Sequence, residues 1–321
     1  MTMRAVLFLC LWGAASLATG EEDRAAGTPS KLPTVVGPLR PDGNFVSLSH
    51  RDHPGNRIGY RFHEHAPLIF GAAPDDGDAS ELERVQALEK DFASRPAVLV
   101  HKRPVREEGW YPQDWTYYIA PAEDGFDLLW VIETKDQGLN EFYCVQQCFR
   151  MGGLTNSEWR RSIAETPAFS EYDLWARQEA QQESLTSLSH VHAGGDWLAI
   201  PATRENVGYR TGVGVILDTN RTGGEISKAG LEPYKPAFSD QVLDSGLIVR
   251  RSLDGQWVCG LFWERATHVT NHHPADCLHA VVNLGPIAPH AKRAIRGKVY
   301  WMKASLDEVY KRWQQDFAGG E

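Results

Sequence analysis

Acid–base chemistry is the first reaction type that the segment from residue 256 to residue 284 suggests. Glu264 ends an apolar run there, and histidines follow it. A carboxylate and a neutral imidazole held close together act as general acid and general base near neutral pH. We therefore predict catalysis by Glu264 together with one histidine. The candidate histidines are His190, His192, His272 and His279. The alternative is a surface ion pair of Glu264 with Arg265, and histidines that lie in loops.

Binding of a polar ligand is the second chemistry that particular side chains favour. The indole rings of Trp263 and Trp110 offer flat apolar surfaces on which a sugar ring stacks. Amide and guanidinium groups bind hydroxyl and carboxylate oxygens, the guanidinium often bidentately. The predicted binding residues are Gln146, Arg150, Arg161, Trp263, Asn271 and Trp110. The alternative is a structural use of these side chains, with the glutamine bound to backbone groups and the arginines on a solvated helix.

A metal site is the third chemistry considered, and it rests on the spacing of His190 and His192. On a strand, residues two apart face the same side, so both imidazoles could bind one divalent metal. The candidate third ligands are His272, His273, His279 and Asp276. The alternative is a polar site or a solvated loop without metal. No other cofactor is predicted.

Four cysteines follow the first twenty residues, namely Cys144, Cys148, Cys259 and Cys277. On a strand, Cys144 and Cys148 share a face about 13 Å apart, at a rise of about 3.3 Å per residue. A disulfide needs Cα atoms within about 7 Å, so this pair does not bridge. Two readings stay open: a Cys259–Cys277 disulfide, or four buried thiols.

The N-terminus predicts export. Residues 1–20 combine Arg4, a short apolar run and small residues before an acidic start, as a secretory signal peptide does. We therefore expect a secreted or periplasmic protein. Residues 21–43 are rich in proline, glycine and alanine and are predicted to be a flexible lead-in. No later segment has about 18 consecutive apolar residues, so no membrane span is expected. The net charge of −9 disfavours nucleic acid as a partner.

Many short strands with few helices are indicated between residues 44 and 321. Residues 57–65 alternate, with Ile58, Tyr60 and Phe62 on one face. Residues 115–134 and 245–264 read as hairpins, the second turning at Asp254-Gly255. A single domain results, a large antiparallel β-sandwich with a few peripheral helices and an inserted helical segment near residues 154–185.

The C-terminal third of the sequence resembles a known superfamily. GQWVCGLFWE at residues 255–264, followed after a polar loop by CLHAVVNLGPIAPHAKRAIRGKVYWMKASLDEVYKRW, resembles the large β-sandwich of the galactose-mutarotase-like superfamily and of secreted bacterial proteins that share it. The resemblance implies this fold and a carbohydrate, or another small polar molecule, as ligand. It carries no catalytic residue over to this chain.

Three functions are therefore weighed. The first is a secreted carbohydrate-active or carbohydrate-binding protein, with acid–base catalysis on a sugar or oligosaccharide as an epimerase, lyase or hydrolase. The second is a non-catalytic glycan-binding or surface-assembly module. The third is a metal-dependent enzyme that uses the clustered histidines. The sequence leaves the oligomeric state open.

Overall fold

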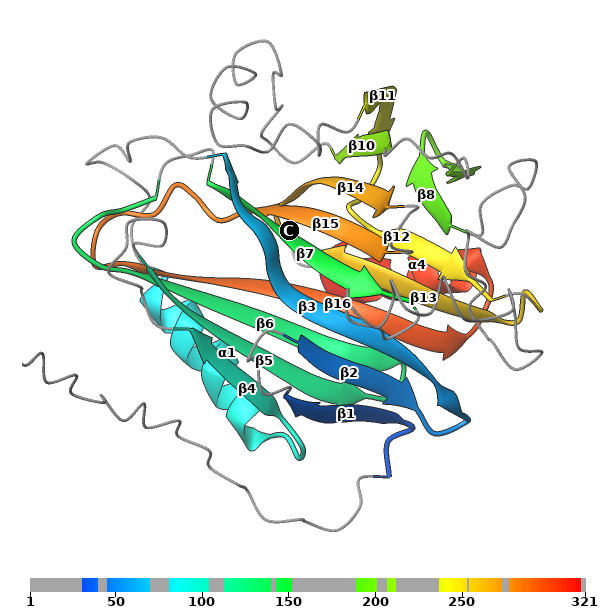
Figure 1. Ribbon diagram of the computed structural model, residues 1–321, viewed down its shortest axis with the longest axis horizontal. Coiled ribbons are helices and arrows are strands. Elements are labelled where there is room, and N and C mark those ends of the chain that lie inside the picture. The colour runs from blue at the N-terminus through cyan, green and yellow to red at the C-terminus, as the bar shows by residue number, and fades with distance from the viewer. Residues whose placement is uncertain are drawn as a thin grey trace, which may run out of the picture. The chain divides into compact units, whose positions relative to one another are not determined.

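The computed structural model describes residues 31–39, 45–69, 81–103, 113–139, 143–151, 189–200, 207–211, 237–252, 254–272 and 277–318. These residues form two sheets of eight strands each, and two helices (Figure 1). The predicted signal peptide and the predicted helical segment near residues 154–185 lie outside the described residues. The described residues belong to one compact unit, Lys31–Glu321.

The first sheet, sheet A, contains the central strands β7 and β15. Its order is β1 (Thr34–Leu39), β2 (Phe45–His50), β3 (His53–Ile69), β7 (Cys144–Arg150), β15 (Cys277–Asn283), β14 (Ala266–His272), β10 (Val207–Thr211) and β11 (Ala237–Leu243). Neighbouring strands are antiparallel except β10 and β11, which are parallel.

The second sheet, sheet B, is antiparallel throughout. Its order is β4 (Leu99–Arg103), β5 (Gln113–Ala122), β6 (Gly125–Thr134), β16 (Lys292–Lys303), β13 (Trp257–Trp263), β12 (Ile248–Arg251), β8 (Ser189–Ala193) and β9 (Asp196–Ala199). The predicted antiparallel β-sandwich is therefore confirmed.

The main hydrophobic core lies between the two sheets, because alternate residues of each strand point inward. Sheet A contributes Tyr60 and Phe149, whose rings stack with centroids 4.3 Å apart. Sheet B contributes Trp130 and Trp263, in edge contact at 6.1 Å. The alternation predicted for Ile58, Tyr60 and Phe62 is confirmed, since all three are core residues.

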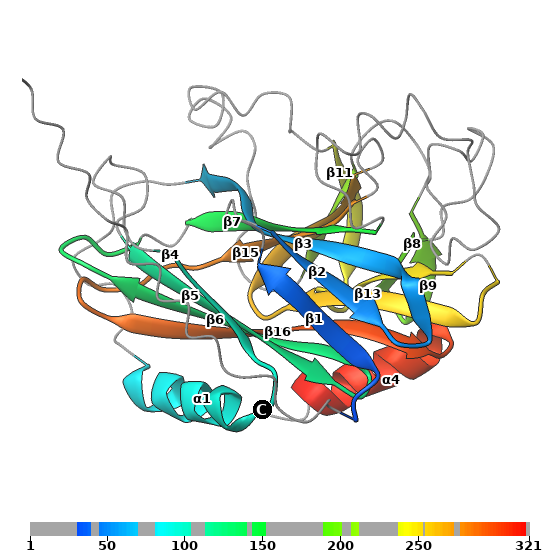
Figure 2. The same ribbon diagram turned by 60° about the horizontal axis from the view of Figure 1, so that its bottom comes forward.

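Two helices cover the outer face of sheet B (Figure 2). Helix α1 (Leu82–Ser94) packs Val85 and Phe92 against β5, β6 and β16. Helix α4 (Leu306–Phe317) packs over β12, β13 and β16, and a Ser305–Glu308 capping box fixes its start. The two helices therefore cover much of the side of sheet B that points away from the core.

The strand β1 corrects the predicted flexible lead-in. It falls within residues 21–43, yet it pairs with β2 from Thr34 to Leu39. Backbone pairing and the buried Thr34 hydroxyl, which donates to Ala122 O at 2.6 Å, hold this segment on the sandwich. The two predicted hairpins are both present, as β5–β6 and β12–β13. Gly255 has φ +69°, the left-handed conformation that a tight turn needs.

Candidate functional site

A buried polar face is formed by the side of sheet A that points away from the core. In β7, Val145 and Phe149 point inward, so Gln146, Cys148 and Arg150 share the opposite side. The register of the paired strands places residues of β15 and β14 on the same side. Cys148 lies opposite His279 on β15, His279 lies opposite Thr270 on β14, and Val281 lies between Gln146 and His268. Below we call this the outer face of sheet A.

The polar residues near the centre of this face are less than a tenth exposed. They are Gln146 (8%), Cys148 (0%), Arg150 (5%), His268 (4%), Thr270 (5%), Cys277 (0%) and His279 (4%). Burying this many polar groups is costly unless they bind one another or a ligand. These buried polar side chains therefore reduce the stability of the free protein unless hydrogen bonds or a ligand compensate.

Three arginines lie on the strands that form this face. Arg150 lies opposite Cys277, Arg210 on β10 lies opposite His268, and Arg61 on β3 lies opposite Cys148. Among the described side chains that β7, β15, β14 and β10 direct to this face, none is a carboxylate. Guanidinium groups on such a face are of the kind that binds carboxylate or phosphate oxygens.

His268 is a neutral member of this face. Burial, with smaller contributions from His279 and the Arg210 charge, lowers the pKa of His268 to about 3. Its Nδ1 lies 3.1 Å from the Thr267 hydroxyl oxygen. At neutral pH His268 therefore donates and accepts hydrogen bonds without carrying charge, and its pKa is too low for a general base.

Gln146 carries a buried amide with unused hydrogen-bonding capacity. Its Nε2 is enclosed, and no described residue accepts a hydrogen bond from it. Its neighbour Gln147 points the other way, into the core, where Tyr60 donates to its Oε1 at 2.6 Å. An amide left without a partner costs about 1–3 kcal/mol, so Gln146 is a donor suited to a ligand oxygen.

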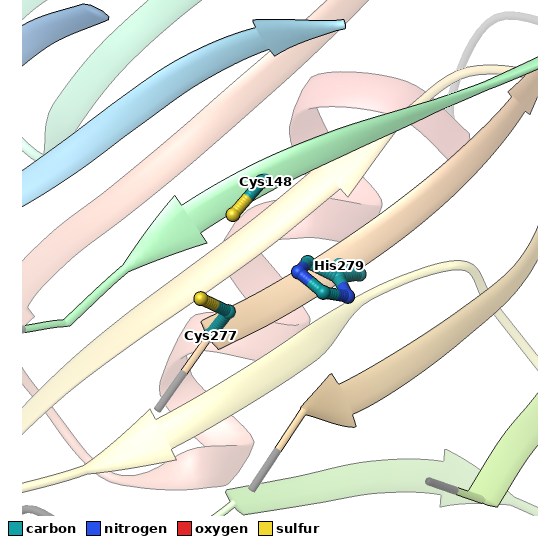
Figure 3. Close-up of side chains that lie close together, drawn as sticks. All are labelled: Cys148, Cys277 and His279. Carbon is teal, nitrogen blue, oxygen red and sulfur yellow. The ribbon is translucent and has the colours of Figure 1, made fainter. Parts of the chain in front are cut away.

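A compact cluster of two thiols and an imidazole lies at the centre of the face. Cys148, Cys277 and His279 each direct one potential ligand atom to within 4.8 Å of the other two. Figure 3 shows both sulfur atoms on one side of His279, above the adjoining strands β7 and β15. The Nδ1 of His279 lies 3.3 Å from the Thr270 hydroxyl on the other neighbouring strand, β14. Below we call these three residues the thiol–imidazole cluster.

The four described cysteines are buried and form no disulfide, in agreement with the second of the two predicted alternatives. Cys144 and Cys148 share one face of β7, as predicted. Cys259 points into the core from sheet B, whereas Cys277 points outward from sheet A. Because the two thiols lie on different sheets and point to different sides, a Cys259–Cys277 disulfide is not formed.

Glu264 lies on the far side of the sandwich from His279. Its carboxylate accepts hydrogen bonds from Arg84 of α1 at 2.9 Å and from the Arg296 side chain at 2.7 Å. It also accepts one from the Arg296 backbone N–H at 2.8 Å. These partners belong to the helix-covered outer face of sheet B. The structure therefore does not bring Glu264 together with His279, and its contacts join α1 to β16.

Trp263 and Asn271, both predicted to bind ligand, point between the sheets. Trp263 is 1% exposed and belongs to the main core. The Asn271 Oδ1 accepts a hydrogen bond from Arg250 at 3.1 Å, and Arg250 also donates to the Ser189 hydroxyl at 2.6 Å. This buried polar contact links sheet A to sheet B. The structure thus places neither side chain on the outer face of sheet A.

His190 and His192 share one side of β8, as the spacing predicted, but that side belongs to sheet B. The ring of His192 stacks on Tyr310 of α4 at 4.0 Å, and its Nδ1 lies 2.7 Å from Asp244 Oδ2. The backbone N–H groups of Gly195 and Gly194, and then His192, lower the pKa of Asp244. His279 points outward from the other sheet, so it does not join this pair as a third metal ligand.

Three predicted residues are not placed by the structure. Arg161 and Trp110 lie outside the described residues, and only the backbone of His272 is described, at the end of β14. Of the predicted site residues, Gln146, Arg150 and His279 are the ones that the structure brings together on one face. Sequence reasoning missed Cys148, Cys277, Thr270, His268 and Arg210 as their neighbours.

Comparisons with known proteins found similar solved structures and assign no residue roles. No protein-family model and no curated protein matches the chain. Similar solved structures include a Synechocystis protein, with 9% identity and a TM-score of 0.41, covering 87% of this chain and 99% of that one. A putative aldose 1-epimerase from Escherichia coli has 8% identity and a TM-score of 0.39, covering 84% of this chain and 100% of that one.

An α-N-acetylgalactosaminidase from Bifidobacterium bifidum, solved with GalNAc, has 8% identity and a TM-score of 0.42. The match covers 89% of this chain and 38% of that enzyme. Several other similar structures are galactose mutarotase-like proteins, which is the resemblance expected from the sequence. At these TM-scores the likenesses assign no reaction to this chain. Neither described helix is long and apolar enough to span a membrane.

Proposed function

We propose that this chain is an exported protein that binds a carbohydrate carrying an anionic group, such as a uronic acid, on the outer face of sheet A. The observation that supports the proposal is that Gln146, Arg150 and Arg210 lie on the same polar face of sheet A, with Gln146 and Arg150 buried. The predicted signal peptide of residues 1–20 supports the export.

The chemistry of the face matches both parts of such a ligand. Guanidinium groups bind a carboxylate bidentately, and these bonds strengthen where water is excluded. The Gln146 amide and the neutral His268 suit sugar hydroxyls, which both donate and accept hydrogen bonds. The local positive charge also offsets the repulsion that a chain of net charge −9 exerts on an anion.

Calorimetric titration tests the proposal directly. The chain without residues 1–20 is titrated with a galacturonic acid oligosaccharide and with the neutral galactose oligosaccharide of equal length. We expect the acidic ligand to bind more tightly, with an affinity that falls as salt rises. Equal affinity for both ligands, or binding of neither, contradicts the proposal. Mass spectrometry of the mixture shows whether binding is accompanied by turnover.

A further inference from the structure

The thiol–imidazole cluster has the donor set of a metal site. The geometry points to a Zn²⁺ ion held by the Sγ atoms of Cys148 and Cys277 and by the Nε2 of His279. This inference does not rest on the proposed function, because it concerns the metal alone. It also differs from the predicted histidine site on β8, whose His192 is bound to Asp244 instead.

The pairing of β7 with β15 holds the three donor residues next to one another. Cys148 and His279 lie directly opposite each other on β7 and β15, and Cys277 is two residues before His279 on the same side of β15. The three donor atoms lie within 4.8 Å of one another (Figure 3). A tetrahedral zinc ion with Zn–S bonds of about 2.3 Å and Zn–N bonds of about 2.0 Å needs its ligand atoms roughly 3.5–3.8 Å apart. From separations of at most 4.8 Å, the donor atoms must therefore approach one another by no more than roughly 1.3 Å, which small side-chain rotations supply.

The charge of the donors suits a divalent ion in a buried place. All three residues are at most 4% exposed. On binding, each thiol gives its proton to solvent, and two thiolates then neutralise the charge of Zn²⁺. A neutral complex avoids the high cost of burying an uncompensated ion. Thiolate sulfur and imidazole nitrogen are also the ligands that zinc prefers over oxygen donors.

Thr270 orients the imidazole for this role. Its hydroxyl lies 3.3 Å from His279 Nδ1 on β14, the neighbour of β15 on the side away from Cys148. An Nδ1–H that donates to Thr270 fixes the tautomer and directs Nε2 toward the sulfur atoms, as outer-shell partners of zinc-binding histidines do. A ligated imidazole cannot also transfer protons, so the assignment replaces the acid–base role predicted for His279. Three protein ligands leave one tetrahedral position open, the arrangement of zinc sites that react with or bind small molecules.

Cobalt spectroscopy tests the site without any activity assay. The chain without residues 1–20 is purified without metal-affinity steps. It is dialysed against a chelator under reducing conditions and then titrated with Co²⁺. We expect one ion per chain, the absorption of tetrahedral Co²⁺, and a thiolate-to-cobalt charge-transfer band that Zn²⁺ abolishes. Cys148→Ser and Cys277→Ser should each weaken the charge-transfer band, and Thr270→Val should weaken binding by about tenfold or more.

Cys144→Ala is the matched control, since Cys144 is a buried cysteine of the same strand outside the cluster. Burial raises the pKa of Cys144 to about 12, so it remains a thiol. The control should bind Co²⁺ as the wild type does. Three results overturn the inference: no charge-transfer band in the wild type, an equal loss in Cys144→Ala, or a Cys148–Cys277 disulfide in the freshly purified chain. The wild-type spectrum keeps the test decisive even if a variant fails to fold.

Discussion

Glu264 and His279 lie on opposite outer faces of the sandwich, although only fourteen residues separate them in the sequence. Glu264 binds two arginines on the side covered by α1. His279 lies among polar side chains on the outer face of sheet A. The catalytic pair predicted from the sequence is therefore not formed. Glu264 belongs to a structural ion-pair network, and His279 belongs to a candidate ligand-binding face.

Replacing Glu264 should affect stability and leave ligand binding unchanged. Glu264→Gln removes the charge that the Arg84 and Arg296 guanidinium groups bind, and loss of such charge-assisted bonds costs roughly 1–3 kcal/mol. Chemical denaturation measures the change. Glu83→Gln, at an exposed position of helix α1 beside Arg84, should alter the free energy of unfolding by less than about 0.5 kcal/mol. A Glu264 variant that is fully stable but no longer binds ligand would show that this carboxylate belongs to the site.

The turn between β13 and β14 explains why the sequence misplaced Glu264. β13 belongs to sheet B and β14 to sheet A, so the chain crosses between sheets at Glu264 and Arg265. Arg265 has φ +61°, which is uncommon for a residue with a side chain, and its guanidinium donates to Asn283 O at 2.9 Å. Hydrophobic alternation predicts strands and the side each residue shares, but not which sheet a strand joins.

The face itself was only partly predictable from sequence. Alternation predicted the shared side of Cys144 and Cys148, and Gln146 and Arg150 were predicted only as binding residues. The partners of Cys148 come from β15, more than a hundred residues later, through a register that local patterns do not specify. Helix α4, by contrast, begins at a local signal, because Ser305 and Glu308 form a capping box within four residues of sequence.

Removing the Gln146 amide should leave the free protein as stable as the wild type or more stable. Gln146→Met keeps the length of the side chain, and it removes a buried amide nitrogen that no described residue binds. We expect unfolding free energy unchanged or higher by about 1 kcal/mol, together with weaker binding of the acidic sugar. Thermal unfolding and calorimetry measure the two quantities. A clear loss of stability with unchanged binding would assign Gln146 to the scaffold.

Arg150 should govern the preference for an acidic ligand. Arg150→Gln removes a charge-assisted contact worth roughly 1.5–3 kcal/mol, which is about a 10- to 100-fold rise in Kd. The neutral oligosaccharide should lose far less affinity, so the two ligands should bind the variant almost equally. Arg251→Gln, at an exposed position of β12, is the control and should retain the preference. If Arg150→Gln keeps the wild-type preference, another group binds the anion.

His268 should make stability fall as the solution becomes more acidic. The pKa of His268 is lowered to about 3 in the folded chain, below its ordinary value of 6.5. The unfolded chain therefore binds an extra proton between these values, and unfolding becomes more favourable by up to about 1.4 kcal/mol per pH unit as pH falls through this range. His268→Gln should reduce this slope between pH 6 and pH 5, where carboxylates remain ionised. His290→Gln, at an exposed histidine, should not. An unchanged slope in the His268 variant would mean that this ring titrates normally.

A crystal structure of the chain without residues 1–20, bound to a galacturonic acid oligosaccharide, tests the central claim most directly. The account predicts the sugar on the outer face of sheet A, with its carboxylate bound by Arg150 and a hydroxyl bound by the Gln146 amide. Sugar bound beside Glu264 or His192 on the outer face of sheet B, with the outer face of sheet A left without ligand, would contradict it.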